Sequence, residues 1–331
     1  MGQDMPPQLV ARPLTPGDVS AVYGYGLPAT TEVSGGLSTV GKGQAIYLEA
    51  EVDSTIAPSS ITNVVWSYTS SPVGLPAVLT SSALGTNVPV YEPADRLVYQ
   101  VAGGALGRKL FRGSMEGRYT VTASIMSTNG TTNVTKTFTI GSYLGIYFCK
   151  LCHSGGQSAP NKYDPWKTTG HSMIFTEGID GLLGYYAESC IKCHTVGYDT
   201  DTNAVNGGFD DVAKQYGWVF PTPTNGNWAN MVINYPLLTN VANIQCENCH
   251  GSGSQHAYSL GNTNLISVTV NSGDCNQCHD APPHHIYGTE WYNSMHAITT
   301  REPSGPSRAA CVGCHTSYGF IGRIEGDSKW F

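Results

Sequence analysis

The first 145 residues show a two-residue alternation of apolar and polar side chains. The alternation is clearest in residues 44–52, 119–125 and 134–140. In the first of these runs, aliphatic side chains fill one face, and tyrosine and glutamate fill the other. A period of two is typical of a strand with one buried face, so each run predicts a half-buried β-strand.

Turn signals connect these runs. Asn129-Gly130 separates the second run from the third, and Asn-Gly between alternating segments is a strong signal for a β-hairpin. Residues 61–68 and 97–101 are further candidate strands. Several short strands within about 100 residues predict an all-β, immunoglobulin-like sandwich over residues 1–145. This part contains no cysteine, no histidine and no catalytic constellation.

Residues 146–331 have a different pattern. Gly, Pro, Asn, Ser and Thr interrupt the chain, and no long amphipathic helical period is present. The pattern predicts a second domain that is mostly loop with short helices.

All ten cysteines of the chain lie in this second part, within five copies of Cys-x-x-Cys-His. The copies are Cys149–His153, Cys190–His194, Cys246–His250, Cys275–His279 and Cys311–His315, and their second cysteines are Cys152, Cys193, Cys249, Cys278 and Cys314. This pentapeptide is the attachment motif for haem c, which forms thioether bonds with both cysteines and takes the histidine as an iron ligand. The sequence therefore predicts a pentahaem cytochrome c domain with five covalently bound haems.

Other uses of the cysteines explain the pattern less well. Structural zinc pairs Cys-x-x-Cys units two by two, which leaves one of five unpaired, and it needs no histidine after each unit. Redox-active pairs of the thioredoxin type open a helix in a strand-helix-strand unit, and the flanking residues show no such context. A disulfide framework leaves the five histidines unexplained.

The histidine count bears on the second axial position of each iron. Ten histidines minus the five motif histidines leaves His171, His256, His284, His285 and His296. Each haem iron has two axial positions, so five haems closed by histidine on both sides need five more imidazoles. The sequence therefore predicts bis-histidine ligation with these five residues as distal ligands.

Short spacings suggest which irons some of these histidines reach. His256 follows His250 by six residues, a length that spans at most about 20 Å when extended and is nearly used up in passing around one macrocycle. A neighbouring iron is therefore the easier target. Pro282-Pro283 favours an extended path into His284 and His285, whose side chains should point apart and serve different haems.

His171 and His296 share a second pattern, because each follows a tryptophan by five residues. Trp166 and Trp291 are expected to pack on a macrocycle while the indole N–H reaches a hydrogen-bond partner. Methionine ligation by Met173 or Met295 is an alternative that the histidine count makes unnecessary.

Composition limits the partners. Charged residues make up only 12% of the chain, and the net charge is −7. Nucleic acid is therefore not an expected partner, and we expect a neutral polar surface that suits contact with other proteins. No apolar run is long enough to predict a transmembrane segment. Thioether attachment of haem takes place outside the cytoplasm, so we expect an extracellular location, with a periplasmic or cell-surface location as the alternative.

Two stretches carry a resemblance to known cytochromes. Cys190-Ile-Lys-Cys-His-Thr-Val-Gly-Tyr198 and Gln245-Cys-Glu-Asn-Cys-His-Gly-Ser-Gly-Ser-Gln-His256 resemble the multihaem family that includes the tetrahaem partner of hydroxylamine oxidoreductase. The resemblance covers residues 149–315. It implies that His256 and the histidines of the two tryptophan segments, His171 and His296, are distal axial ligands.

The second part is also similar to extracellular cytochrome nanowire subunits of the OmcE type. That resemblance implies a homopolymer with a continuous haem stack, in which a histidine of one subunit ligates a haem of the next. Other redox proteins or an extracellular acceptor are then the remaining partners. Four haems are the commoner number in that type, and five here is a departure.

Three functions remain open from the sequence. The first is electron conduction in an extracellular filament, and the second is a monomeric periplasmic electron carrier. The third is a multihaem reductase, which needs one iron with an open position. Every motif keeps its histidine and five further histidines are present, so the sequence favours a protein that is not an enzyme.

Overall fold

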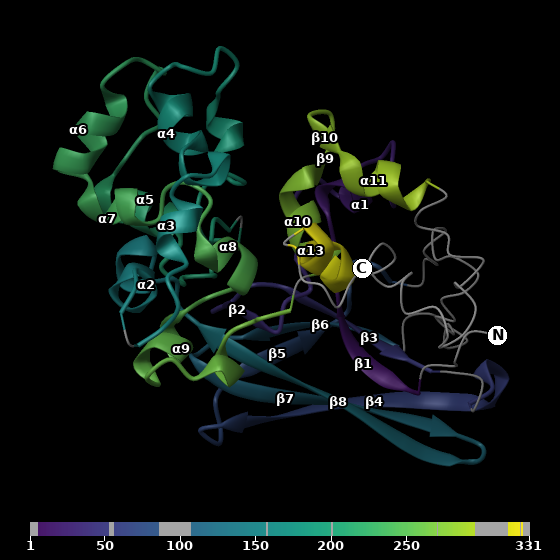
Figure 1. Ribbon diagram of the computed structural model, residues 1–331. Coiled ribbons are helices and arrows are strands. Elements are labelled where there is room, and N and C mark those ends of the chain that lie inside the picture. Colours follow the sequence, from purple (N-terminus) through teal and green to yellow (C-terminus); the bar gives the residue numbers. More distant parts are fainter. Residues whose placement is uncertain are drawn as a thin grey trace.

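The computed structural model describes residues 6–52, 56–85, 107–156, 158–199, 201–269, 271–294, 317–324 and 326. Two four-stranded β-sheets come first in the chain and form a sandwich-like unit, which we call the β-unit (residues 6–141). A helical, loop-rich region with short helices follows (Figure 1).

The first sheet of the β-unit is antiparallel throughout, in the order β1 (Gln8–Arg12), β3 (Ile46–Glu51), β6 (Arg108–Gly113) and β5 (Ala77–Thr80). The second sheet has the order β2 (Thr39–Gly41), β8 (Gly130–Gly141), β7 (Gly117–Ser127) and β4 (Ile61–Ser71). The short strand β2 runs parallel to β8, and the other pairs are antiparallel.

Aromatic and aliphatic side chains from both sheets form the core between them. Phe111, Tyr119 and Phe138 are fully buried, and their rings pack at centroid distances of 5.6 and 6.0 Å around Phe111. The Tyr119 hydroxyl donates a hydrogen bond of 2.9 Å to the carbonyl of Met115, four residues earlier. A second contact of 3.2 Å joins the hydroxyl to the carbonyl of Pro76, so this buried polar group is well satisfied.

The structure confirms the strands predicted from alternation. Residues 44–52, 61–68, 119–125 and 134–140 fall in β3, β4, β7 and β8. The predicted hairpin is present, but its two-residue loop is Thr128-Asn129, because Ser127 already pairs with Gly130. The candidate strand 97–101 lies outside the described residues.

The prediction that β3 is half buried is wrong, because both of its faces are covered. Tyr47 is 2% exposed and packs against Leu14 and Leu84. Glu49 is 4% exposed and accepts a hydrogen bond of 2.8 Å from Arg108. A charged residue on a strand can thus face the interior when a cation on the next strand pairs with it.

The second region is rich in loops and its helices are short, as predicted. Before the third motif these are α2 (Ile146–His153), α3 (Tyr163–Trp166), α4 (Ile174–Ile179), α5 (Phe209–Tyr216), α6 (Asn227–Asn234) and α7 (Pro236–Asn240). From the third motif onward the helices are α8 (Cys246–His250), α9 (Ser254–Tyr258), α10 (Ser272–His279), α11 (Tyr287–Tyr292) and α13 (Ser317–Ile324). A small hairpin of β9 (Asp280–Ala281) and β10 (His285–Ile286) lies between α10 and α11 in the sequence.

The helical region has a hydrophobic core of its own, which the sequence did not predict. Phe175, Ile179, Phe209 and Leu238 are fully buried in one cluster with neighbouring aromatic residues. The motifs are unevenly spaced, and 246 − 190 = 56 residues separate the starts of the second and third. That interval is long enough to bury apolar surface without a cofactor.

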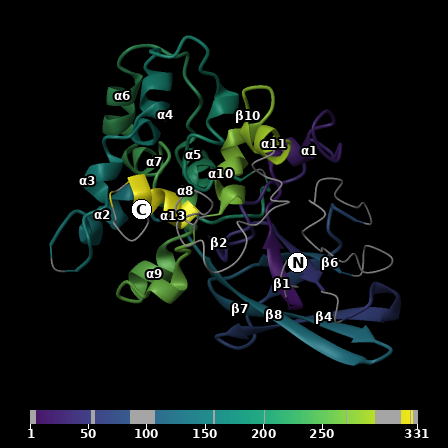
Figure 2. The same cartoon turned by 45° about the vertical axis from the view of Figure 1, so that its right-hand side comes forward.

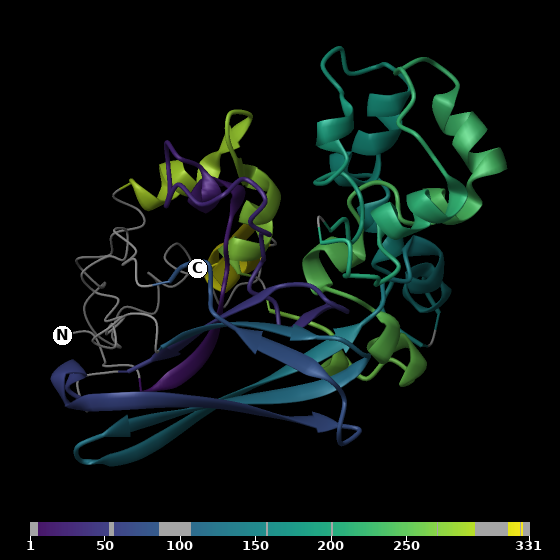
Figure 3. The ribbon, with the colours of Figure 1, turned by 180° about the vertical axis from the view of Figure 1, so that it is seen from behind.

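A segment near the N-terminus contacts the part of the helical region that carries the fourth motif. Helix α1 (Pro16–Val19) contacts α10 and β9, and it lies beside α10 and α11 in two views (Figures 1 and 2). Just before α1, the Thr15 hydroxyl donates a hydrogen bond of 2.8 Å to Asp280. From behind, the helices form two groups above the sheets, with α1 in the group of α10 and α11 (Figure 3).

Within the described ranges, we find no helix with the length and apolar character needed to cross a lipid bilayer.

Candidate haem attachment and ligation sites

Four of the five Cys-x-x-Cys-His motifs lie in the described residues, and each is on a short helical turn. Helix α2 ends with the first motif, α8 is the third, and α10 ends with the fourth. The second motif begins at Cys190, the last residue of a 3-10 turn. Helical backbone brings residues three apart to one face, so both thiols of a motif can reach one macrocycle edge. The fifth motif, Cys311–His315, lies outside the described residues, as does His296.

The cysteines of different motifs meet in pairs. The thiols of Cys149 and Cys246 are in hydrogen-bond contact, which raises the pKa of Cys149 and lowers that of Cys246. Cys193 and Cys278 form the same kind of pair, and the Cys278 Sγ lies 3.7 Å from the carbonyl oxygen of Cys193. All eight described cysteines are free of disulfides.

The third and fourth motifs are also close to each other, because α8 and α10 are in contact. Burial, and next the charges of Asp274 and Cys275, raise the pKa of Cys249 to about 12. The four described motifs therefore follow one another in space in the order 149–153, 246–250, 275–279 and 190–194. This order differs from the order in the sequence.

Two histidines outside the motifs lie opposite motif histidines. The ring centres of His256 and His153 are 6.4 Å apart, with 24° between the ring planes. Those of His171 and His279 are 6.2 Å apart. Metal–imidazole bonds of about 2 Å place the centres of two axial rings on one iron roughly 6 Å apart. The spacing of both pairs therefore fits bis-histidine ligation.

Hydrogen bonds to backbone carbonyls fix the orientation of three imidazoles, those of His153, His250 and His256. The Nδ1 atoms of His153, His250 and His256 lie 3.4, 2.7 and 2.9 Å from the carbonyl oxygens of Pro160, Ser267 and Asn262. A carbonyl can only accept, so Nδ1 carries the proton and Nε2 is left as a bare electron pair. This is the tautomer that binds a metal through Nε2, with an outer hydrogen bond to hold the ring.

His171, His194, His279 and His285 form a cluster around the fourth motif. The rings of His279 and His285 are 5.4 Å apart, and the Nδ1 atoms of both are buried without a hydrogen-bond partner. Burial, and then the charges of the other three histidines, lowers the pKa of His194 to about 4. A ligand imidazole must be neutral, so burial that disfavours the charged form suits these histidines to binding iron.

The extended path predicted for Pro282-Pro283 is wrong. The backbone N–H of His284 donates to the carbonyl of Ala281, and β9 pairs with β10, so the chain makes a tight hairpin here. The two histidines nevertheless point to different surroundings: His284 is exposed, whereas His285 is partly buried beside His279.

The tryptophan segment before His171 is anchored to the third motif. The Trp166 indole Nε1 donates a hydrogen bond of 2.9 Å to the carbonyl of Ile244, and the Ile244 N–H donates to the carbonyl of His171 at 3.0 Å. The expected indole partner is thus a backbone carbonyl two residues before Cys246. Met173 lies beside His171 and is 41% exposed, and Met295 lies outside the described residues.

The surroundings of the motifs also fit a large apolar ligand. Inside the first motif, Leu151 is 72% exposed, and Tyr258 and Leu260 after His256 are 65% and 100% exposed. An attached macrocycle would cover such side chains. Among the described residues, no three His, Cys, Asp or Glu side chains are arranged to hold a bare metal ion.

Two carboxylates near the sites were not predicted from the sequence. Glu247 lies inside the third motif and is 3% exposed, and its carboxylate accepts hydrogen bonds from the backbone N–H groups of Leu144, Gly145 and Gly253. The second carboxylate is that of Glu116, which lies in the β-unit and contacts the start of α9. The run of Gly and Ser after His250 was the available signal, because small residues mark close backbone approach.

Comparison of this chain with protein-family models, with curated proteins and with solved structures finds no match.

Proposed function

We propose that this chain is a pentahaem c-type cytochrome that conducts electrons through a continuous row of haems with histidine on both sides of each iron. We further propose that it acts as the subunit of an extracellular filament. When bound, haem iron supplies one-electron chemistry by changing between the ferric and ferrous states.

The residues have separate tasks in this proposal. The cysteine pairs at 149/152, 190/193, 246/249, 275/278 and 311/314 attach the five haems, and the histidine that ends each motif is the proximal ligand. His256 is the distal partner of His153, and His171 that of His279, on the ring spacings of 6.4 and 6.2 Å. His284, His285 and His296 remain proposed ligands for the other irons.

The observation that carries the proposal is the row formed by the four described motifs. Thiols of neighbouring motifs are in contact between Cys149 and Cys246 and between Cys278 and Cys193, and α8 contacts α10 where the charge of Cys275 acts on Cys249. Thioether sulfurs lie at macrocycle edges, so their proximity brings neighbouring edges together. Electron transfer over a chain needs such proximity at every step.

Both ends of this row reach the surface, which supports transfer between subunits. At one end Cys152 is exposed, so the haem attached to it would itself lie at the surface. At the other, Leu182 and Tyr185 near the second motif are 71% and 75% exposed. A haem at the surface of one end and exposed apolar side chains at the other suit contact with further copies of the chain.

We also propose that the β-unit is immunoglobulin-like. Labelled A to G along the chain, the two sheets have the orders A-B-E-D and A′-G-F-C, which agree with the immunoglobulin arrangement of ABED on CFG. The bond from the Tyr119 hydroxyl to the Met115 carbonyl corresponds to the tyrosine corner at the start of strand F.

Electron microscopy and spectroscopy of the secreted full-length protein test the proposal together. We expect long filaments, five haems per chain by pyridine haemochrome assay, and only low-spin ferric signals. Compact monodisperse particles with the same spectra would favour a monomeric periplasmic carrier. A high-spin ferric signal, or a Soret shift on adding cyanide or nitrite, would favour a reductase.

A further inference from the structure

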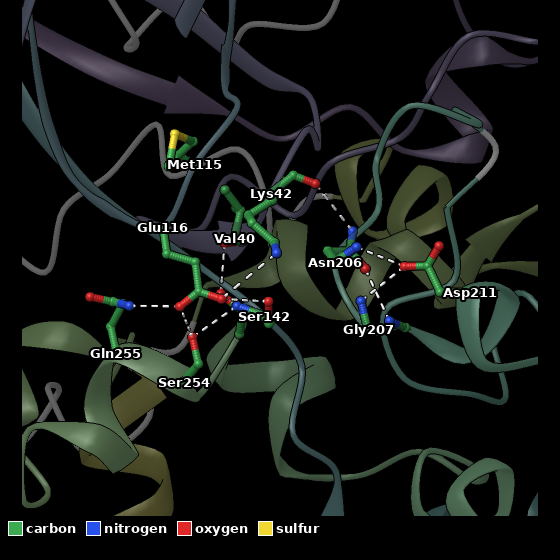
Figure 4. Close-up of polar contacts among 12 residues, drawn as sticks. Val40, Lys42, Met115, Glu116, Ser142, Asn206, Gly207, Asp211, Ser254 and Gln255 are labelled. Carbon is green, nitrogen blue, oxygen red and sulfur yellow. Dashed lines mark hydrogen bonds and ion pairs between the residues drawn. The ribbon is translucent and has the colours of Figure 1, made fainter. Parts of the chain in front are cut away.

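The β-unit meets the helical region at a polar contact built around Glu116, which directly precedes β7 (Figure 4). Its carboxylate accepts hydrogen bonds from the hydroxyls of Ser142 and Ser254 at 2.6 and 2.9 Å, and from the Gln255 amide at 2.8 Å. Lys42 adds an ion pair at 3.8 Å. Glu116 is thus bonded to two consecutive residues at the start of α9.

Backbone groups of β2 and of Ser142, the residue that follows β8, also hold this segment. The Ser252 hydroxyl donates to the carbonyl of Val40 at 2.7 Å, and the Ser254 hydroxyl accepts from the Ser142 N–H at 2.9 Å. A Cβ atom on Gly251 would lie 2.0 Å from the carbonyl oxygen of Thr39, so no larger residue fits there.

Glu247 fixes the same segment from the haem side. Its carboxylate accepts a hydrogen bond of 2.6 Å from the N–H of Gly253. Residues 251–255 are therefore bound between the third motif and the β-unit, and His256 comes directly after them. Its Nδ1 bonds the carbonyl of Asn262, and its ring lies opposite His153.

We propose that Glu116 is a positioning residue for axial ligation: by anchoring the start of α9, the β-unit fixes the plane of the His256 imidazole at the first haem. This inference rests on the proposed function, because it takes His256 as a ligand. It assigns the β-unit a role inside the redox site. Outer hydrogen bonds are known to orient metal-bound imidazoles and to tune the metal.

The consequence for the haem is specific. The planes of His153 and His256 differ by 24°. Ferric haems with nearly parallel axial imidazoles give a rhombic low-spin electron paramagnetic resonance signal, whereas crossed planes give a strongly anisotropic one. Release of α9 would let the His256 ring rotate and would change the signal and the midpoint potential of this haem alone.

The test is electron paramagnetic resonance with a potentiometric titration on the purified, fully haem-loaded E116A, Q255A and E32A variants. E116A is expected to change the signal of one haem in five and to shift one midpoint potential. Q255A removes a single donor to Glu116, so it should move the same haem less. E116Q, which keeps an acceptor oxygen, should restore part of the wild-type signal.

E32A is the matched control. Glu32 is a partly buried carboxylate of the β-unit that pairs with Arg112 and makes no contact with α9 among the interactions we find in the described residues. It should lower stability without moving the haem signal.

An unchanged signal and potential in E116A, or the same shift in E32A, would overturn the positioning role while the wild-type spectrum still supports bis-histidine ligation. A high-spin wild-type spectrum would instead overturn the ligation itself, and the positioning role with it.

Discussion

A Phe175→Ala substitution tests whether the helical region has a core that is independent of its cofactors. The Phe175 side chain is fully buried, and its ring packs against Phe209 at 5.3 Å and Tyr186 at 6.3 Å, with Trp218 and Trp228 further around it. Truncating a fully buried phenylalanine to alanine costs about 3–5 kcal/mol, because apolar burial is lost and a cavity is left. We take about 4 kcal/mol as the expected loss.

This loss should be visible in thermal unfolding of the haem-loaded protein. For a region of this size, each kcal/mol lowers the midpoint by roughly 2–4 °C, so the Tm should fall by about 8–16 °C. Far-ultraviolet and Soret circular dichroism would follow the backbone and the haem environment separately. Val219→Ala is the control, because Val219 is 79% exposed and its truncation should change the Tm by no more than about 2 °C.

A Tm change below about 3 °C for Phe175→Ala would refute the reasoning. It would mean that the aromatic cluster contributes little, and that the cofactors supply nearly all of the buried apolar surface in this region.

Three further results are expected. His256→Ala should leave one haem in five high-spin and able to bind carbon monoxide when reduced, and a fully low-spin variant would exclude His256 as a ligand. Burial raises the pKa of Asp199 to about 7, so the folded protein holds a proton that the unfolded chain releases, and stability falls as the pH rises from about 4 to about 7. Asp199→Asn should remove this loss, with a gain at pH 8 of at most about 4 kcal/mol from three pKa units; a gain that is independent of pH in denaturant titrations would contradict this. Burial alone would raise the pKa of Glu116, but its hydrogen bonds and Lys42 outweigh burial and lower it. Its stabilising contribution is therefore present above about pH 4 and lost as the pH falls through the folded pKa, so the protection factors of residues 252–258, which correct hydrogen exchange for its intrinsic pH dependence, should fall in acid, and equal protection at pH 7 and in acid would count against it.

Local patterns explain why part of this structure could be predicted from the sequence. Strand alternation depends only on neighbours in the chain, and it located β3, β4, β7 and β8. The Cys-x-x-Cys-His motifs likewise need only five consecutive residues. The placement of four of them on helical turns follows from the same local geometry.

Features that depend on distant partners could not be predicted in this way. The pairing of β2 with β8 joins residues about 100 positions apart, and the bond from Thr15 to Asp280 joins residues 265 apart. The second face of β3 is buried because such distant segments cover it. Alternation reports which residues are apolar, and it does not report that a glutamate will meet an arginine.

The average number of residues per motif concealed where a hydrophobic core could form. The 183 residues from Cys149 to Phe331 average about 37 per motif, which is too few for a conventional core around every haem. The true intervals are uneven, and the long one between the second and third motifs contains the buried cluster around Phe209 and Leu238. Counting residues between successive motifs would have indicated where a conventional core has room to form.

The six-residue step from His250 to His256 has a physical basis in the docking of the β-unit. The backbone leaves His250 through Gly251, where a positive φ of 75° and the nearby Thr39 carbonyl both require glycine. It then runs along the β-unit, bonded through Ser252 to Val40 in β2 and through Ser254 to Glu116 before β7 and Ser142 after β8, and α9 turns His256 toward His153. A shorter step would leave no chain to contact the sandwich, and a larger side chain at 251 would push the chain off it. The spacing therefore serves two purposes at once, because the residues that separate the two histidines are the same residues that attach the β-unit to the haem-binding region.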